Sequence, residues 1–187
     1  MVSLNRVVMQ PASRRLIQTL GPHGLHACEI SGTSGEMFAF KTYRQFRYPD
    51  HDICEGPYIE TSEKAEKFDL VLNNQVWEHL DKPYAATRNV RRMLCKGGNF
   101  WVAVPFFVPF HAASMDNSRW SARGMKNLLV EAGFEDHAIQ SWQWGNAHVA
   151  RRNLDNGPWP PVYDEATDDV TDDPEMPVCA WALARKT

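Results

Sequence analysis

The clearest pattern of apolar and polar positions lies in residues 68–105. Two apolar runs, at 68–72 and 100–104, are strand-like in length and end in polar residues or proline. Apolar side chains between them recur at the spacing of one helix face: Ala86, Val90, Met93 and Leu94. We expect Gly97-Gly98 to end this helix. A strand, a helix and a second strand form a βαβ unit, which predicts a parallel sheet covered on both faces.

The rest of the chain shows weaker patterns of the same kind. Strands are predicted at 25–30, 43–48, 136–144 and 178–184, and helices at 12–20, 121–132 and 146–153. Ser121 and Gly133 have the character of the residues that cap the two ends of a helix. Residues 36–40 could begin one more helix. Between the strand at 43–48 and Asp52 there is no room for a full helix.

Length and composition indicate one domain with a short helical segment at residues 1–24. Residues 154–177 are rich in proline, and their 164–175 part has seven acidic and no basic residues. We expect a solvated loop there, with a binding surface as the alternative. The rest of the chain has sixteen acidic and twenty basic residues, a slight positive excess. The basic residues do not form a dense stripe, which disfavours nucleic acid as a partner.

The four cysteines are scattered, without the spacing of a zinc site or a disulfide framework. No apolar run is long enough to cross a membrane, and the N-terminus has no apolar signal region. We therefore expect a cytoplasmic protein without a membrane partner and without a bound metal.

Polar residues follow both strands of the βαβ unit, where parallel sheets place their ligands. Asn74, Gln75 and Val76 come after the first strand, and Glu78-His79 follows them. Glu78 suits the first turn of a helix for electrostatic reasons alone. His79 is either a general base or a packed, hydrogen-bonded histidine.

Residues 68–105 also resemble a known family. FDLV at 68–71, EHL beginning at Glu78 and GG before an apolar strand resemble class I S-adenosylmethionine-dependent methyltransferases, with types 11 and 23 nearest. The resemblance extends more weakly over residues 25–134 and includes the cluster H-x4-D-x2-R-W-S that begins at His111. It implies a single Rossmann-like, doubly wound, mostly parallel sheet whose last strand is antiparallel. The segment between the second and third strands of that fold would be shortened here.

The same resemblance implies S-adenosylmethionine as cofactor. Residues 29–35, EISGTSG, occupy the place of the family's glycine-rich motif, with Ser31 and Thr33 where glycines are expected. A plain turn that binds nothing is the alternative, because side chains obstruct the approach of a ligand to the backbone. Glu29 would hold the turn or accept from the cofactor ammonium. The candidate cofactor-binding residues are Glu29, Ser31, Gly32, Thr33, Gly35, Asp50, Asp52, Ile53, Asn74, Gln75 and Val76.

Two aspartates among them are candidates for the cofactor's nucleoside. An acid about twenty residues beyond the glycine-rich motif is expected on the ribose. Asp50 is favoured for the ribose and Asp52 for the adenine side. Either aspartate could instead cap a turn after Pro49.

The loop after residue 105 supplies further candidates. His79 and His111 are the candidate catalytic residues, because imidazole titrates in the range needed to accept a proton. Arg119 and Trp120 are the candidate substrate-binding residues. The alternative is an ion pair between Asp116 and Arg119, with Trp120 packed onto the core.

The leading hypothesis is a methyltransferase that acts on a hydroxyl or amine of a small-molecule or glycan-type substrate. An inactive methyltransferase-like scaffold is the first alternative, motivated by the altered glycine-rich motif. An enzyme of this fold with non-methylating chemistry is the second. A homodimer or a complex with a partner subunit fits any of the three.

Overall fold

The computed structural model describes residues 2–58, 67–111, 115–155 and 157–187. Its centre is a six-stranded sheet of order β2-β1-β3-β4-β6-β5. The strands are β1 (His26–Ile30), β2 (Thr42–Phe46), β3 (Phe68–Asn74), β4 (Leu94–Pro105), β5 (Ile139–Trp144) and β6 (Cys179–Arg185). The pairs among β1 to β4 are parallel, and β6 is antiparallel to both β4 and β5. The predicted Rossmann-like sheet with an antiparallel last strand is confirmed.

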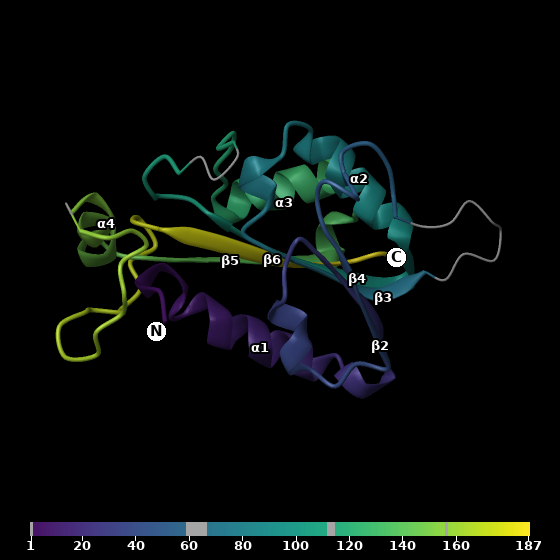
Figure 1. The fold of residues 1–187 in the computed structure, drawn as a ribbon, viewed down its shortest axis with the longest axis horizontal. Coiled ribbons are helices and arrows are strands. Elements are labelled where there is room, and N and C mark those ends of the chain that lie inside the picture. Colours follow the sequence, from purple (N-terminus) through teal and green to yellow (C-terminus); the bar gives the residue numbers. More distant parts are fainter. Residues whose placement is uncertain (1, 59–66, 112–114, 156) are drawn as a thin grey trace.

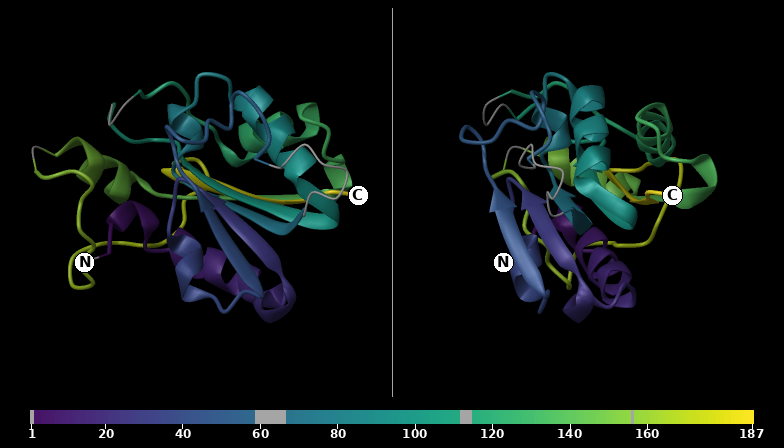
Figure 2. Two further views of the ribbon diagram at one scale, coloured as in Figure 1. Left: turned by 45° about the vertical axis from the view of Figure 1, so that its right-hand side comes forward. Right: turned by 90° about the vertical axis from the view of Figure 1, so that its right-hand side faces the viewer.

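Helices cover both faces of this sheet, as Figures 1 and 2 show. Helix α1 (Met9–Thr19) lies on one face, whereas α2 (Pro83–Met93) and α3 (Ala122–Glu131) lie on the other. Helix α4 (Ala147–Leu154) lies at one end of the sheet. Short 3-10 turns connect the elements: η1 (Leu4–Arg6), η2 (Pro22–Gly24), η3 (Ser34–Met37), η4 (Trp77–His79) and η5 (Asp136–Ala138).

Local sequence signals set the ends of several helices. The Ser121 side chain accepts from the Gly124 N–H at the start of α3, and Gly133 after this helix has a φ of 103°. Both caps agree with the prediction. At the start of α4, the Asn146 side chain accepts from the Val149 N–H in the same way.

Two predicted boundaries were wrong. The expected helix at 36–40 is only the single turn η3. Gly97-Gly98 does not end α2, because this helix stops at Met93 and both glycines lie within β4. A Cβ on Gly98 would lie 2.9 Å from the Phe68 carbonyl oxygen. This glycine therefore permits the close approach of β3 to β4.

The sheet separates two apolar clusters, one on each face. The α2–α3 cluster includes Val71, Trp77 and Phe100, while the α1 cluster includes Leu72 and Trp101. Side chains of alternating positions on β3 and β4 enter opposite clusters, as expected for strands covered on both faces.

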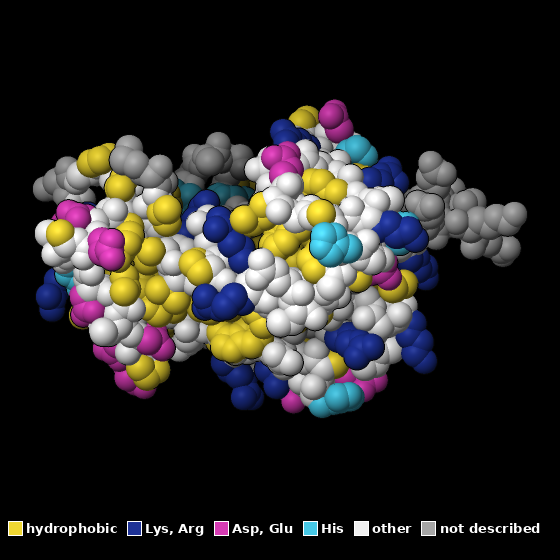
Figure 3. Space-filling view, turned by 90° about the horizontal axis from the view of Figure 1, so that it is seen from below, with side chains coloured by type: hydrophobic (Ala, Val, Ile, Leu, Met, Phe, Trp, Pro, Cys, Tyr) yellow, Lys and Arg dark blue, Asp and Glu magenta, His cyan; other side chains and the backbone are white. Residues whose placement is uncertain are grey.

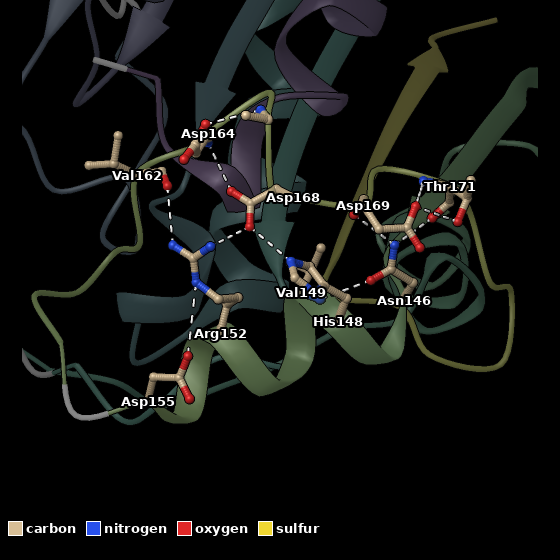
Figure 4. Close-up of polar contacts among 11 residues, drawn as sticks. Asn146, His148, Val149, Arg152, Asp155, Val162, Asp164, Asp168, Asp169 and Thr171 are labelled. Atoms are coloured by element: carbon tan, nitrogen blue, oxygen red, sulfur yellow. Dashed lines mark hydrogen bonds and ion pairs between the residues drawn. The ribbon is translucent and has the colours of Figure 1, made fainter.

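The acidic segment 164–175 is not fully solvated, contrary to the simplest expectation. The Asp168 side chain is buried and forms an ion pair with Arg152, as Figure 4 shows. It also accepts from His148 Nε2 at 2.8 Å and from the Asp164 N–H at 2.8 Å. Asp168 thus anchors this segment to α4.

Charges are unevenly distributed over the surface. Figure 3 shows acidic side chains gathered at the end of the molecule where the acidic segment lies, with Lys and Arg near the middle of the same face. Within the described ranges, no helix has the length and apolar character needed to cross a lipid bilayer.

We predict that Asp168→Asn lowers the free energy of unfolding at pH 7 by roughly 2–3 kcal/mol, because it leaves buried donors poorly matched. Burial raises the pKa of Asp168, but the hydrogen bonds from His148 and Asp164 and the charge of Arg152 outweigh it, so the pKa falls below 3.8. This stabilisation is present above the ordinary pKa and is lost as the pH falls through the lower folded pKa.

Denaturant unfolding of both proteins from pH 7 to pH 3 tests the prediction. The difference in the free energy of unfolding between the unaltered protein and Asp168→Asn should become smaller below about pH 4. Glu165→Gln, in the exposed part of the same segment, is the control and should leave stability unchanged. An equal loss of stability in Asp168→Asn and Glu165→Gln would show that the contacts of Asp168 do not hold this segment in place.

Candidate active site

A buried carboxylate shapes the turn after β1. Glu29 is fully buried, and its two oxygens accept four hydrogen bonds. The donors are the Ser34 N–H (3.0 Å), the Ser34 hydroxyl (2.6 Å), the Gly35 N–H (2.7 Å) and the Tyr43 hydroxyl (2.5 Å). These hydrogen bonds are those of a residue that holds the turn, which is one of the two roles predicted for Glu29.

The two glycines of this turn serve packing within the protein. A Cβ on Gly32 would collide with the Glu29 carboxylate, and one on Gly35 would lie 2.5 Å from the Tyr43 ring and 2.9 Å from Leu72. Both positions therefore need glycine whether or not a ligand binds.

The chain makes a sharp corner after β1 and another after β3. Ser31 has a φ of 52° and Gln75 a φ of 57°, in the left-handed region that glycine adopts most easily. The Ser31 N–H donates to the Phe46 carbonyl and the Gln75 N–H to the Ala103 carbonyl, both at 2.8 Å. Each corner is thus fixed to the end of a neighbouring strand.

Three pockets adjoin at this edge of the sheet. The β2-side pocket has a volume of about 410 Å³ and lies among Ile30, Ser31, Ile53, Tyr58, Gln75 and Val76. The α1-side pocket has about 370 Å³ and lies among Arg6, Gln10, Ser31, Thr33, Asn74 and Trp101. The η4-side pocket has about 150 Å³ and lies among Arg6, Gln75, Glu78, His79, His111 and Trp159.

Shared residues show that the three pockets are neighbours. Ser31 lines the first two, Arg6 lines the second and third, and Gln75 and His79 line the first and third. The carboxyl ends of β1 and β3 therefore lie at the junction of all three.

The α1-side pocket contains polar groups without a partner. In the described structure, Asn74 Oδ1 and Trp101 Nε1 are buried and make no hydrogen bond. Burial lowers the pKa of the nearby Arg6 guanidinium. One unmatched donor and one unmatched acceptor beside a cation are features that suit a zwitterionic ligand.

Glu78 has a similar position in the η4-side pocket. It is fully buried, and neither carboxylate oxygen has a hydrogen-bond partner in the described part of the chain. Burial raises the pKa of its carboxyl to about 7, although the charges of Arg119 and Arg6 act in the opposite direction. A favourable position at a helix terminus, the structural interpretation of Glu78, does not by itself account for this burial without a partner.

The two candidate catalytic histidines lie side by side. The His79 and His111 ring centres are 5.2 Å apart, and His79 Nε2 is 3.7 Å from Glu78 Oε1. The His79 Nδ1 atom contacts the Met115 carbonyl oxygen. His111 also packs on Trp159, with 4.6 Å between ring centres.

The structure contains the expected ion pair of the loop after β4. Arg119 forms an ion pair with Asp116, which also accepts from the His111 N–H at 2.8 Å. The hydrogen bond from Arg119 lowers the pKa of Asp116 to about 2. Trp120 packs against the core cluster of the α2–α3 face. These contacts favour the structural interpretation of Arg119 and Trp120 over substrate binding.

The two candidate aspartates lie in different places. Asp52 and Ile53 line the β2-side pocket, and the Asp52 side chain also accepts from the Cys54 N–H at 2.8 Å. Asp50 is exposed in the turn after β2 and does not itself line this pocket, although Tyr48 and His51 on either side of it do.

Sequence reasoning missed Arg6, which is distant in the chain from the other residues of the site. Arg6, from η1, reaches the site because the Leu4 N–H donates to the Pro161 carbonyl at 2.8 Å and the Ser3–Val162 bridge holds this segment in place. No local pattern marks Arg6, since long-range contacts position it. Trp159, from the proline-rich segment, was expected in the core or in a pocket wall, and it lines the η4-side pocket.

Comparison with known proteins finds one matching family model and several structures of the same fold. Residues 15–102 match the family model of a methyltransferase domain, type 11. No curated protein matches the chain in sequence. A Thermotoga maritima structure, described as a methyltransferase dependent on S-adenosylmethionine and possible histamine N-methyltransferase, has a TM-score of 0.62 at 16% identity. The match covers 95% of this chain and 89% of that one.

Two further structures have the same fold. A Mesorhizobium loti methyltransferase dependent on S-adenosylmethionine has a TM-score of 0.55 at 12% identity, over 94% of this chain and 96% of that one. Phosphoethanolamine N-methyltransferase 2 of Haemonchus contortus, in complex with S-adenosylmethionine, has a TM-score of 0.54 at 12% identity, over 94% and 52%. Residues 15–102 therefore resemble a methyltransferase domain of type 11, and the chain as a whole has the fold of methyltransferases that depend on S-adenosylmethionine.

Proposed function

We propose that the chain transfers a methyl group from S-adenosylmethionine to an oxygen or nitrogen of a small-molecule or glycan-type acceptor. The observation that carries this proposal is the junction of three pockets at Ser31, Arg6, Gln75 and His79. Two of these pockets suit the two ends of the cofactor, and the third adjoins both.

The unmatched groups fit the chemistry of the cofactor. In the α1-side pocket, Arg6 and the Trp101 N–H would hold its carboxylate, and Asn74 Oδ1 would accept from its ammonium. In the β2-side pocket, the apolar side chains of Ile53 and Val76 would enclose the adenine. The sulfur would then lie near the shared corner at Ser31.

Asp52 is the better placed of the two aspartates for the nucleoside, because it lines the β2-side pocket. Gly32, Thr33 and Gly35 would act through the shape of the turn that Glu29 holds. Gln75 would close the passage between the β2-side and η4-side pockets.

The η4-side pocket would receive the acceptor group. S-adenosylmethionine supplies a methyl group already activated by a sulfonium, so the protein mainly aligns the acceptor and excludes water. His79 or His111 would take the proton when the acceptor is a hydroxyl. The small volume of this pocket suits one functional group, with the rest of the acceptor outside it.

Two named relatives support a small acceptor. The T. maritima protein is described as a possible histamine N-methyltransferase, and the H. contortus protein methylates phosphoethanolamine. Both names denote small amines. From these names we propose only that the acceptor of the present chain is also a small molecule.

The inactive scaffold predicts a different site. In that case Ser31 or Thr33 would fill the cofactor space, yet both side chains line open pockets. Non-methylating chemistry in the same site would be distinguished by product analysis with S-adenosylmethionine and each acceptor class.

We predict that Arg6→Gln weakens the binding of S-adenosylhomocysteine by about 10–100-fold, because it removes a charge-assisted contact to the carboxylate. Isothermal titration calorimetry measures the change. Arg15→Gln, which removes an exposed charge from α1 outside the pocket, should bind like the unaltered protein. Absence of binding to the unaltered chain at millimolar ligand would refute the cofactor assignment.

We also predict that Glu29→Gln lowers the free energy of unfolding by about 3 kcal/mol and S-adenosylhomocysteine affinity at least tenfold. An amide would place its own donors against the N–H groups of Ser34 and Gly35. Thermal unfolding with and without ligand measures both effects. Glu36→Gln, on the exposed side of the same turn, is the control. An unchanged affinity of Glu29→Gln for S-adenosylhomocysteine would show that this turn does not contribute to cofactor binding.

A further inference from the structure

The unmatched carboxylate of Glu78 has no role in the proposed binding of the cofactor. It lies fully buried in the η4-side pocket without a hydrogen bond in the described structure. A buried, ionised carboxylate without a hydrogen bond is costly, and a cation beside it offsets part of that cost. A positively charged ligand in this pocket would therefore be favoured by Glu78.

Two imidazoles face the same space. One ligand atom from each of Glu78, His79 and His111 lies within 4.8 Å of the others. A first-row metal ion about 2.0–2.2 Å from each ligand atom needs these atoms roughly 3–3.6 Å apart. His79 Nε2 and Glu78 Oε1, at 3.7 Å, are already close to that separation. Small movements of the side chains would complete the set.

Hydrogen bonds leave the required nitrogen atoms free. His79 donates from Nδ1 to the Met115 carbonyl, and His111 Nδ1 lies 3.2 Å from the Pro109 carbonyl oxygen. His111 Nδ1 is also 3.5 Å from the Asp116 carboxylate, which Arg119 holds in place. When Nδ1 carries the proton, the lone pair on Nε2 is free to bind a metal ion. Histidines that bind metals usually donate their other ring N–H to a carbonyl or carboxylate oxygen, as these two would.

The backbone fixes the ligands before any ion binds. Glu78 and His79 are adjacent in the turn η4, so both arise from one rigid segment. The Asn117 N–H donates to the Glu78 carbonyl at 2.8 Å and holds the loop of His111 and Asp116 against this turn. The site is therefore built from two segments joined by main-chain hydrogen bonds.

We propose that Glu78, His79 and His111 form a binding site for one divalent transition-metal ion in the η4-side pocket. Two imidazoles and one carboxylate favour ions such as Zn²⁺, Mn²⁺ or Co²⁺ over Mg²⁺ or Ca²⁺, which prefer oxygen ligands. Three protein ligands leave coordination positions open, as in catalytic rather than structural sites.

The nearby charges are compatible with such an ion. Arg119 is paired with Asp116, which leaves Arg6 as the cation that shares the pocket with Glu78. Arg6 also lines the α1-side pocket, where the cofactor carboxylate would neutralise it. The Glu78 carboxylate then remains for the metal.

The consequence for chemistry rests on the proposed function. A hydroxyl bound at an open position of the ion would lose its proton to solvent water more easily and become a better methyl acceptor. With both Nε2 atoms bound to the metal, this route would replace proton transfer to His79 or His111. The site then favours an oxygen nucleophile over an amine.

Titration of the full chain, freed of metal by a chelator, tests the site. Calorimetry with Zn²⁺ should give one ion per chain, and Mg²⁺ should give no comparable heat. Co²⁺ should produce visible absorption bands without the thiolate charge transfer that ligation by the free cysteines would add. His79→Gln and His111→Gln should each weaken binding at least tenfold, and Glu78→Gln likewise.

Controls separate this proposal from the cofactor assignment. His137→Gln removes an exposed histidine at the opposite edge of the sheet and should leave metal affinity unchanged. Each ligand variant is also titrated with S-adenosylhomocysteine, and retained binding would show that it folds. Absence of stoichiometric binding, or affinity unchanged by all three ligand variants, would overturn the metal site whether or not the cofactor binds.

Discussion

The hydrogen bonds of the buried Glu29 carboxylate are the interaction on which this site depends. They tie the main chain of Ser34 and Gly35 to the end of β1 and join the turn to Tyr43 on β2. A charged group without water needs such partners, so the turn and the carboxylate specify each other. The corner at Ser31 and the pockets on either side of it follow from that arrangement.

The strand β3, which neighbours β1, ends in a similar corner. β1 and β3 pair in parallel, with Ile30 opposite Asn73, so their corners at Ser31 and Gln75 fall at the same edge of the sheet. Both corners lie in the left-handed backbone region, which costs about 1–2 kcal/mol for a residue with a side chain. Hydrogen bonds to β2 and β4 offset part of this cost. The sheet thus sets the distance between the cofactor pockets and the acceptor pocket.

Much of this architecture could be predicted from sequence, because local signals encode it. The βαβ unit, the capped helix after Ser121 and the final strand all follow from periodicity and capping. The start of β4 could not be predicted, since pairing with β3 and β6 overrides the turn preference of two glycines. The contribution of Arg6 depends on contacts between the two ends of the chain, for which local sequence has no signal. The turn after β1 was expected although Ser31 and Thr33 replace family glycines, but the left-handed backbone at residue 31 could not be predicted from a serine.

A crystal structure of the chain with S-adenosylhomocysteine tests the central claim most directly. The account predicts adenosine in the β2-side pocket, the amino-acid end beside Arg6 and Asn74, and the sulfur near Ser31 and facing the η4-side pocket. A ligand bound elsewhere, or crystals grown at saturating ligand with this edge of the sheet unchanged and unoccupied, would contradict it.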